Sequence, residues 1–141
     1  MSSIDNRKHP RYPASLPVAI SLGAVVASES AYLNNISVGG VSFNAMVELN
    51  PGTMIMLHFP VSKPVFSTPG RVLWCRKMAF QYSVGVEFTD VNLNFRERMV
   101  DLVRKIEEFR VQAVSSGRNI SGQDATLEWI EQFGGDFFRA G

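Results

Sequence analysis

The sequence has little of what several classes of protein require. It contains one cysteine, Cys75, among 141 residues, so one chain can form neither a disulfide nor a zinc site made of several cysteines. Because Cys75 lies between Trp74 and Arg76 in a strand-like run, we expect a small buried or half-buried thiol rather than a catalytic one. No apolar run approaches the ~20 residues of a membrane-spanning helix, and the polar, basic first residues do not form a signal peptide. These absences predict a cytoplasmic protein without direct membrane insertion.

Side chains for catalysis are also scarce. His9 and His58 are the two histidines, and neither has a serine or cysteine partner with an orienting acid nearby in the sequence. The G-x-S-x-G, H-E-x-x-H, Walker and G-x-G-x-x-G patterns are absent. The formal net charge is +1, so any function that depends on basic residues must be local. We therefore expect no enzymatic activity, no catalytic residue, no metal site and no cofactor.

What the sequence does have is a regular alternation of apolar residues. Apolar residues make up 45% and charged residues 19% of the chain, which is typical of one globular domain. Short runs that alternate, or that are rich in β-branched and aromatic residues, are separated by turn residues; these runs cover 16–22, 31–36, 41–43, 55–59, 70–76 and 82–88. This mainly β pattern predicts an antiparallel sandwich or barrel.

The apolar period changes to that of a helix over residues 92–113. Apolar side chains recur there at steps of three and four, at Phe95, Met99, Leu102, Val103, Ile106 and Phe109. This predicts one helix whose apolar stripe packs on the sheet. A linker over 115–122 and a short second helix over 124–133 follow. The apolar residues of this tail either pack on the barrel's own surface, which we favour, or contact a second copy or a partner: Leu127, Trp129, Ile130, Phe133, Phe137 and Phe138.

The segment NRKHPRYPASLP, residues 6–17, is basic and rich in proline. Its prolines keep the preceding residues out of the helical region, so we expect an extended or turned arm. Arg7 and Arg11 are four apart, roughly 13 Å in an extended chain at ~3.3 Å per residue. Two guanidinium groups on a stiff segment can bind two phosphates or guanine edges. The alternative is a solvated basic terminus.

The segment NNISVGG, residues 34–40, combines small polar residues with glycines. Asn35 and Ser37 are two apart in a strand, so both project to one face while Ile36 points into the core. Gly39 and Gly40 can adopt positive φ, and beside their free backbone N–H groups the polar side chains would form a ledge for a base edge or a phosphate. The alternative is an ordinary hairpin turn. An N-x-S pattern recurs at residues 119–121, so this pattern alone has little specificity.

The two segments together resemble a known signature. R-x-x-x-R at residues 7–11, followed by N-x-S-x-x-G from residue 35, is similar to the paired motifs of PilZ domains. The strand pair at 70–76 and 82–88 and the helix after it also resemble this family. The resemblance covers roughly residues 5–113.

The resemblance implies a six-stranded antiparallel β-barrel with a C-terminal α-helix that binds cyclic di-GMP, a bacterial second messenger. By this resemblance, Arg7 and Arg11 clamp the ligand's phosphates and guanine edges, and Asn35 and Ser37 contact a guanine. The final glycine, Gly40, maintains the turn shape and the clearance for the ligand, and Gly39 beside it completes the predicted ligand-binding set.

Two positions depart from the commonest form of the family. Asn35 takes the place of the more frequent aspartate and so lacks a negative charge that could pair with guanine donors. Asn6 stands where many members have another arginine. One cation fewer leaves open whether the site holds one ligand molecule or a stacked pair.

The expected organisation is a mobile ligand-binding arm (residues 1–12), the barrel with its helix (13–113), and a linker with a short helical tail (114–141). The expected function is a cyclic di-GMP receptor or adaptor that orders its arm on binding and signals to an unidentified protein partner, with a dimer through the tail as one further prospect. The alternative is a PilZ-like interaction module that does not bind the nucleotide. A binder of single-stranded nucleic acid ranks last, because no cluster of aromatic and basic residues lies outside the arm.

Overall fold

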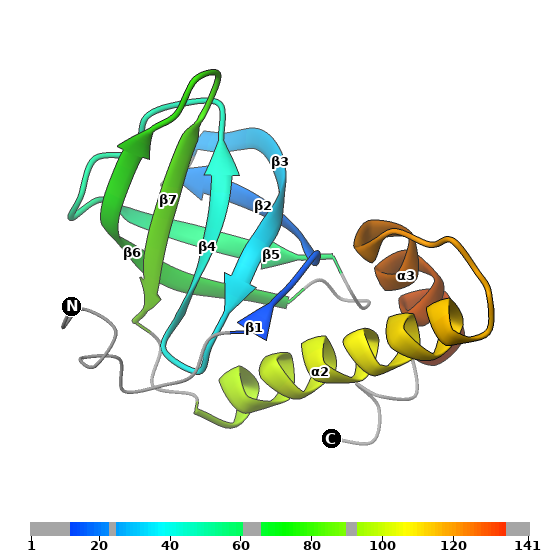
Figure 1. Ribbon diagram of the computed structural model, residues 1–141. Helices are drawn as coiled ribbons and strands as arrows, with labels where there is room; N and C mark the ends of the chain where they lie inside the picture. The colour runs from blue at the N-terminus through cyan, green and yellow to red at the C-terminus, as the bar shows by residue number, and fades with distance from the viewer. Residues whose placement is uncertain (1–11, 23–24, 61–65, 90–92, 135–141) are drawn as a thin grey trace, which may run out of the picture.

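Six antiparallel strands form a closed barrel (Figure 1). The computed structural model describes residues 12–22, 25–60, 66–89 and 93–134. The barrel order is β3-β2-β5-β6-β7-β4, and pairing of β4 with β3 closes it. The strands are β2 (Pro17–Leu22), β3 (Val25–Ile36), β4 (Gly40–Ala45), β5 (Met54–Phe59), β6 (Phe66–Lys77) and β7 (Tyr82–Phe88). The predicted six-stranded antiparallel β-barrel is confirmed.

A further short strand, β1 (Tyr12–Pro13), lies outside the barrel. It pairs with the last residues of β3, Tyr12 with Ile36 and Pro13 with Asn35. The sequence did not indicate this strand, because two residues are too few to show an alternating pattern. Its consequence is that the chain preceding Tyr12 joins the barrel beside the β3–β4 turn.

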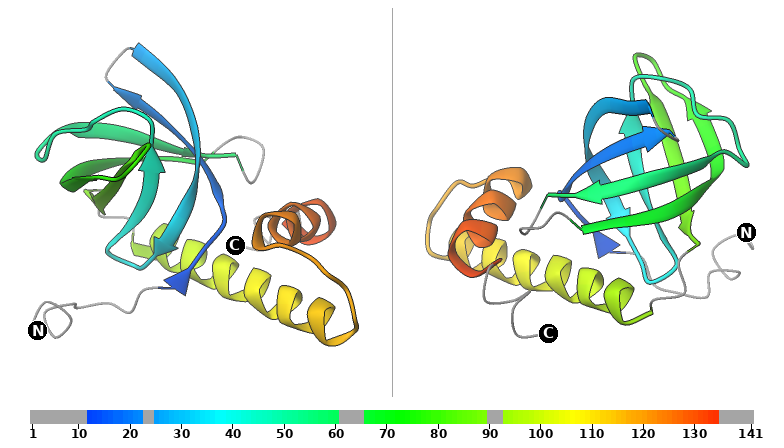
Figure 2. Two further views of the ribbon diagram at one scale, coloured as in Figure 1. Left: turned by 45° about the horizontal axis from the view of Figure 1, so that its top comes forward. Right: turned by 180° about the vertical axis from the view of Figure 1, so that it is seen from behind.

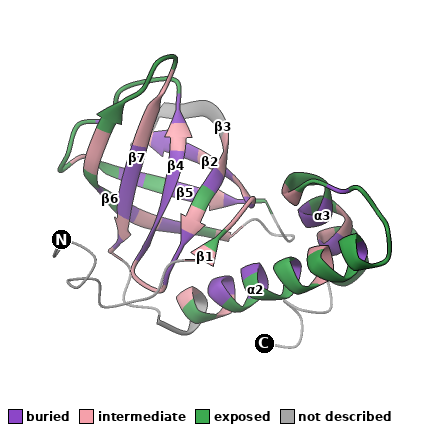
Figure 3. Ribbon diagram, viewed as in Figure 1, coloured by how far each residue is buried: buried purple, intermediate pink, exposed green. Residues whose placement is uncertain are grey.

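The core cluster draws buried residues from the strands β2 to β7 and from the helix that follows β7 (Figure 3). Burying side chains of this size contributes about 1.5–3 kcal/mol each, which makes the barrel wall a rigid support for groups on its outer face. The largest fully buried side chains include Phe43, Phe59, Leu16, Ile36 and Leu57. The single thiol, Cys75, is free and half-buried.

The helix α2 (Leu93–Ser115) runs across one end of the barrel, with α3 (Gly122–Trp129) beside it (Figure 2). Met99 and Leu102 on α2 are fully buried, as the apolar stripe predicts. Ser121 caps α3 by accepting a bond from the N–H of Asp124. Within the described residues, no helix has the length and apolar character needed to cross a membrane.

The tail packs on the rest of the molecule through Trp129. This side chain is 6% exposed and belongs to the barrel's core cluster. The ring of Phe133 contacts those of Phe109 and Trp129, with centroids 6.5 and 5.7 Å apart. Leu127 remains half exposed, while Phe137 and Phe138 lie outside the described residues. Within the described residues α3 contacts α2, and Trp129 joins the core cluster that the barrel and α2 share.

Candidate ligand-binding face at the β3–β4 turn

The turn between β3 and β4 is held together by a serine. The Oγ of Ser37 accepts bonds from the N–H groups of Gly39 and Gly40, at 3.1 and 3.2 Å. The N–H of Ser37 donates to the carbonyl of Gly40 at 2.8 Å, and the residue is 5% exposed. Two accepted bonds occupy the lone pairs of the hydroxyl and leave its O–H as a donor.

This bonding corrects the expectation that the glycine N–H groups are free. A serine hydroxyl competes for nearby backbone N–H groups in turns, and Ser37 takes both. Positive φ is also not used here, because among the described residues only Gly52 and Gly117 have it. The turn is thus a preformed loop whose donors are already engaged, rather than an open cradle of backbone N–H groups.

Gly40 is required by a close approach between strands. A Cβ at Gly40 would lie 2.1 Å from the carbonyl oxygen of Val86 on β7, far inside van der Waals contact. The carbonyl of Gly39 accepts a bond of 2.9 Å from the N–H of Phe88. These two contacts seat the turn against the end of β7, so its position relative to β7 is determined by backbone packing.

A row of outward-facing residues crosses four strands beside this turn. The pairing register aligns Asn35 of β3 with Ser42 of β4, Ser42 with Gly85 of β7, and Gly85 with Trp74 of β6. Three strand spacings of ~4.8 Å separate the ends of the row by roughly 14 Å. Ser42 is small and buried, so the row is low at that position and raised at Trp74, whose ring lies over Gly85.

The raised end at Trp74 carries a ring and a cation together. The indole covers Gly85, where a Cβ would lie 2.2 Å from ring atoms. The guanidinium of Arg76 lies 5.1 Å from the Trp74 ring centroid, within the range of a cation–π contact. A planar aromatic group next to a fixed cation suits a flat, electron-rich ligand ring.

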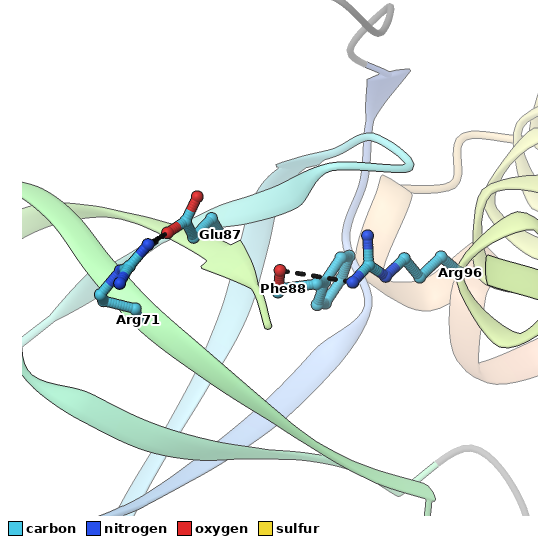
Figure 4. A network of polar contacts seen from close by, with 4 residues as sticks. All are labelled: Arg71, Glu87, Phe88 and Arg96. Atoms are coloured by element: carbon cyan, nitrogen blue, oxygen red, sulfur yellow. Dashed lines mark hydrogen bonds and ion pairs between the residues drawn. The ribbon is translucent and has the colours of Figure 1, made fainter. Parts of the chain in front are cut away.

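Two more arginines lie at the turn end of the face (Figure 4). Arg71 pairs in register with Glu87, which in turn pairs with Gly40, and the two side chains form an ion pair. On α2, the guanidinium of Arg96 lies 5.6 Å from the Phe88 ring centroid and donates to the Phe88 carbonyl at 3.4 Å. Its Nε is buried without a hydrogen-bond partner in the part of the chain that the structure describes.

The arm itself lies outside the described residues. Arg7 and Arg11, the two predicted clamp residues, and Asn6 fall in residues 1–11. The structure does describe the residue that follows Arg11. This residue, Tyr12, pairs with Ile36, which directly precedes Ser37. The ring of Tyr12 is also 5.9 Å from the guanidinium of Arg104 on α2. The predicted residues Asn35, Ser37, Gly39 and Gly40 are brought together at this same end of β3.

A hollow of about 720 Å³ adjoins the face on the side of the helices. Asn44 of β4 lines it and accepts a 2.9 Å bond from Asn34. Across from them, Arg110 of α2 holds Glu107 at 2.6 Å and thereby lowers the pKa of that carboxyl. The hollow leaves room beside the face for a ligand or a chain segment to extend toward α2 and α3.

The one histidine among the described residues is engaged with hydroxyl groups. His58, on β5, bonds to the hydroxyls of Ser21 and Ser67 at 2.8 and 2.7 Å, a cross-strand row without an acid. Across the described ranges, no three histidine, cysteine, aspartate or glutamate side chains are grouped to hold a metal ion. The face therefore offers groups for binding: small polar side chains, an aromatic ring and cations.

Sequence reasoning missed Arg71, Trp74, Arg76 and Arg96. These residues belong to the face because of the order of the strands. β7 lies between β4 and β6, so segments that are distant in the sequence are neighbours in the sheet. A faint signal exists in the run GRVLWCR, where charged and aromatic residues interrupt a buried strand. Which of them lie on the outside depends on the irregular register between Val72 and Trp74, which alternation cannot predict.

The comparison with protein families matches the PilZ domain over residues 5–105. The match covers most of the chain and includes both predicted motifs. The chain belongs to the PilZ domain family. A sequence comparison with curated proteins gave no match.

Several solved structures share the fold of this PilZ domain. The PilZ domain of YcgR from Escherichia coli with c-di-GMP has a TM-score of 0.62 at 12% identity, covering 81% of this chain and 99% of that one. The Bacillus subtilis inhibitor of motility, MotI/DgrA, has a TM-score of 0.57 at 15% identity, covering 72% and 51%. The K. pneumonia MrkH–c-di-GMP complex has a TM-score of 0.54 at 13% identity, covering 80% and 56%. The chain thus spans about half the length of MotI and of MrkH.

Proposed function

We propose that this PilZ domain is a cyclic di-GMP receptor that binds the nucleotide on the face beside the β3–β4 turn. The observation that carries the proposal is the attachment of the arm. Tyr12, which follows Arg11 in the sequence, pairs with Ile36 between Asn35 and Ser37, and this pairing supports a site to which both halves of the signature contribute. YcgR and MrkH, which have this fold, were solved with c-di-GMP.

In this proposal the arm and the barrel hold different parts of the ligand. Arg7 and Arg11 bind the phosphates and guanine edges, because a guanidinium fork matches both. Asn35 offers an amide to a guanine, and the O–H of Ser37 donates to it. Gly39 and Gly40 maintain the turn that positions them. This division leaves the ligand between two surfaces.

The barrel's outer face supplies the second surface. The flat ring of Trp74 with Arg76 against it is suited to stacking on a purine. The ion pair of Arg71 with Glu87 places a cation at the turn end, and its carboxylate keeps that cation in position. The small side chain of Ser42, in register with Gly85 under the ring, gives the ligand clearance between Asn35 and Trp74.

Signalling follows from fixing the arm. Ligand phosphates neutralise arm cations that repel one another, and the arm then lies against β3 and α2, as in other order–disorder switches. Tyr12, next to Arg104 of α2, connects the two. The resulting surface, made of arm and helix, is the one that we propose a protein partner binds.

Calorimetric titration with cyclic di-GMP tests the binding proposal. We expect saturable binding by the wild type and a loss of about 100-fold or more in affinity for Arg7→Ala/Arg11→Ala, because each charge-assisted bond contributes about 1.5–3 kcal/mol. Arg118→Ala, an exposed arginine on the helical tail that pairs with Glu128, is the matched control and should bind normally. Retained affinity in the double variant would remove the arm from the site.

The same titration separates the other functions. GMP, cyclic GMP and a short oligonucleotide should bind far more weakly than cyclic di-GMP. A folded wild type that binds none of them would favour a protein-interaction module, and preference for the oligonucleotide would favour a nucleic-acid binder. The stoichiometry reports whether Asn6, in place of a cation, limits the site to one ligand molecule.

A dimer through the tail is a separate part of the proposal. Leu127 and Phe133 are 50% and 44% exposed on the helical tail and are the described residues suited to a contact between copies. The substitution Leu127→Ser changes this contact and leaves Trp129 in the core. The mass of the variant in solution then tests whether the contact holds a dimer together. A mass unchanged from the wild type at monomer size would rule it out.

A further inference from the structure

The β6–β7 hairpin ends in large apolar side chains that the fold does not bury. Phe80 is 90% exposed and Met78 is 45% exposed. A bond of 2.7 Å from the N–H of Met78 to the carbonyl of Gln81 closes the hairpin, so the tip is a tight, defined turn. The hairpin projects beyond the rest of the barrel, at the end away from α2 and the β3–β4 turn (Figures 1 and 3).

A neighbouring loop adds to this apolar tip. β4 pairs with β7 up to Ala45 opposite Tyr82, so the residue after this pair, Met46, lies beside the hairpin. Met46 is 65% exposed and also lines the hollow beside α2, and Val47 is 50% exposed. Single exposed apolar residues are common on protein surfaces, but several grouped at one projecting end mark an interaction site.

Two cations lie directly behind the apolar tip. Arg76 and Lys77 are exposed at the end of β6, and the hairpin from residue 70 to residue 86 contains no acidic residue. Glu48, in the loop after β4, is the acidic residue nearest in sequence to Met46. The tip therefore combines an apolar apex with a basic collar, a charge pattern complementary to an anionic surface.

The shape of the tip decides which anionic surface fits. A stable protein interface needs about 800 Å² from each partner, and a narrow convex hairpin offers little such area without a matching cavity. The interfacial region of a bilayer accepts projecting apolar side chains to a depth of ~5–10 Å without any complementary shape. Basic residues at the level of the headgroups then pair with anionic lipids. We propose that the β6–β7 hairpin tip docks this domain on an anionic lipid surface.

This contact differs from the membrane insertion that the sequence argues against. The expectation of no membrane insertion was based on the absence of runs of ~20 apolar residues, the length of a spanning helix. An interfacial contact uses the two or three residues of one turn, which no such run reveals. The β3–β4 turn lies at the other end of the barrel (Figure 1), so docking leaves the turn end of the ligand face open to solution, while Arg76 belongs to both the ligand face and the basic collar.

Vesicle co-sedimentation without nucleotide tests the docking. The full chain is mixed with vesicles of phosphatidylcholine alone, or of phosphatidylcholine and phosphatidylglycerol in equal parts. We expect binding to the anionic vesicles that falls with added salt, and a loss of about tenfold in partitioning for Phe80→Ser and for Met78→Ser. Met54→Ser, which changes a 52% exposed methionine on β5, is the matched control and should partition like the wild type.

A second pair of variants tests the basic collar. Lys77→Glu should reduce binding to anionic vesicles by about fivefold or more, whereas Lys105→Glu, on an exposed position of α2, should not. The unfolding midpoint of each variant shows that it is folded.

Three results would overturn the proposal. These are absence of wild-type binding to either vesicle, equal binding by Phe80→Ser, and equal loss in Met54→Ser. A fall from dimer to monomer mass in Phe80→Ser would assign the tip to a second copy instead.

Discussion

The two ends of the barrel are built on opposite principles. At the β3–β4 turn the residues are small and their polar groups are satisfied within the fold, as in Ser37, which is 5% exposed. At the β6–β7 hairpin the side chains are large, apolar and directed outward, as in Phe80, which is 90% exposed. Substitution at the first end should change stability and ligand binding together, and substitution at the second should change an interaction while leaving stability intact.

The largest effect should come from the glycine at the turn end. Gly40→Ala places a Cβ against the backbone carbonyl of Val86, and neither strand can move without breaking the barrel. We expect the free energy of unfolding to fall by about 3 kcal/mol, measured by urea denaturation.

Gly85→Ala is the matched change, because there the obstacle is the side chain of Trp74, which is only half-buried. It should cost about 1 kcal/mol and weaken nucleotide binding by displacing the ring. Equal costs at the two glycines would show that backbone packing does not hold the turn in place.

An intermediate effect is expected at the two serines of the N-x-S patterns. Ser37→Ala leaves two backbone N–H groups of a buried turn without their acceptor and should cost about 2 kcal/mol, with a loss of nucleotide affinity. Ser121→Ala removes the cap of α3 and should cost about 1 kcal/mol without changing affinity. Thermal unfolding measures the stability of both variants, and titration measures their nucleotide affinity. A normal affinity in Ser37→Ala would show that this turn is not part of the binding site.

The smallest stability effects should come from one surface residue at each end. Arg71→Ala breaks an exposed ion pair with Glu87 and should cost less than about 1 kcal/mol. It should still weaken nucleotide binding, because it leaves a carboxylate near the ligand phosphates. Phe80→Ser should change the free energy of unfolding by no more than about 0.5 kcal/mol and leave nucleotide affinity unchanged. A reduced affinity in Phe80→Ser would mean that the two ends are coupled.

The barrel could be predicted from the sequence because its signal is local. Alternation and turn residues locate the six strands of the barrel, and Ile36 is buried next to the half-buried Asn35 as predicted, although Ser37 is also buried. The helix over 93–115 follows from its apolar stripe in the same way.

The parts of the site that could not be predicted depend on contacts between distant segments. The need for glycine at position 40 arises from Val86, and the position of Trp74 arises from Gly85 and a register irregularity in β6. The repeated N-x-S pattern also shows that a local pattern does not identify the site. Ser37 and Ser121 both accept backbone N–H bonds, but only the first lies where another strand and the arm converge.

The unlike surroundings of the two tryptophans have an optical consequence. Trp129 is 6% exposed within the core, whereas Trp74 lies half-buried on the outer face against Arg76. A purine stacked on Trp74 would quench its fluorescence and shield it from iodide, while the blue-shifted emission of Trp129 stays constant. The protein thus carries an intrinsic probe of its ligand face together with an internal reference, and neither requires a label.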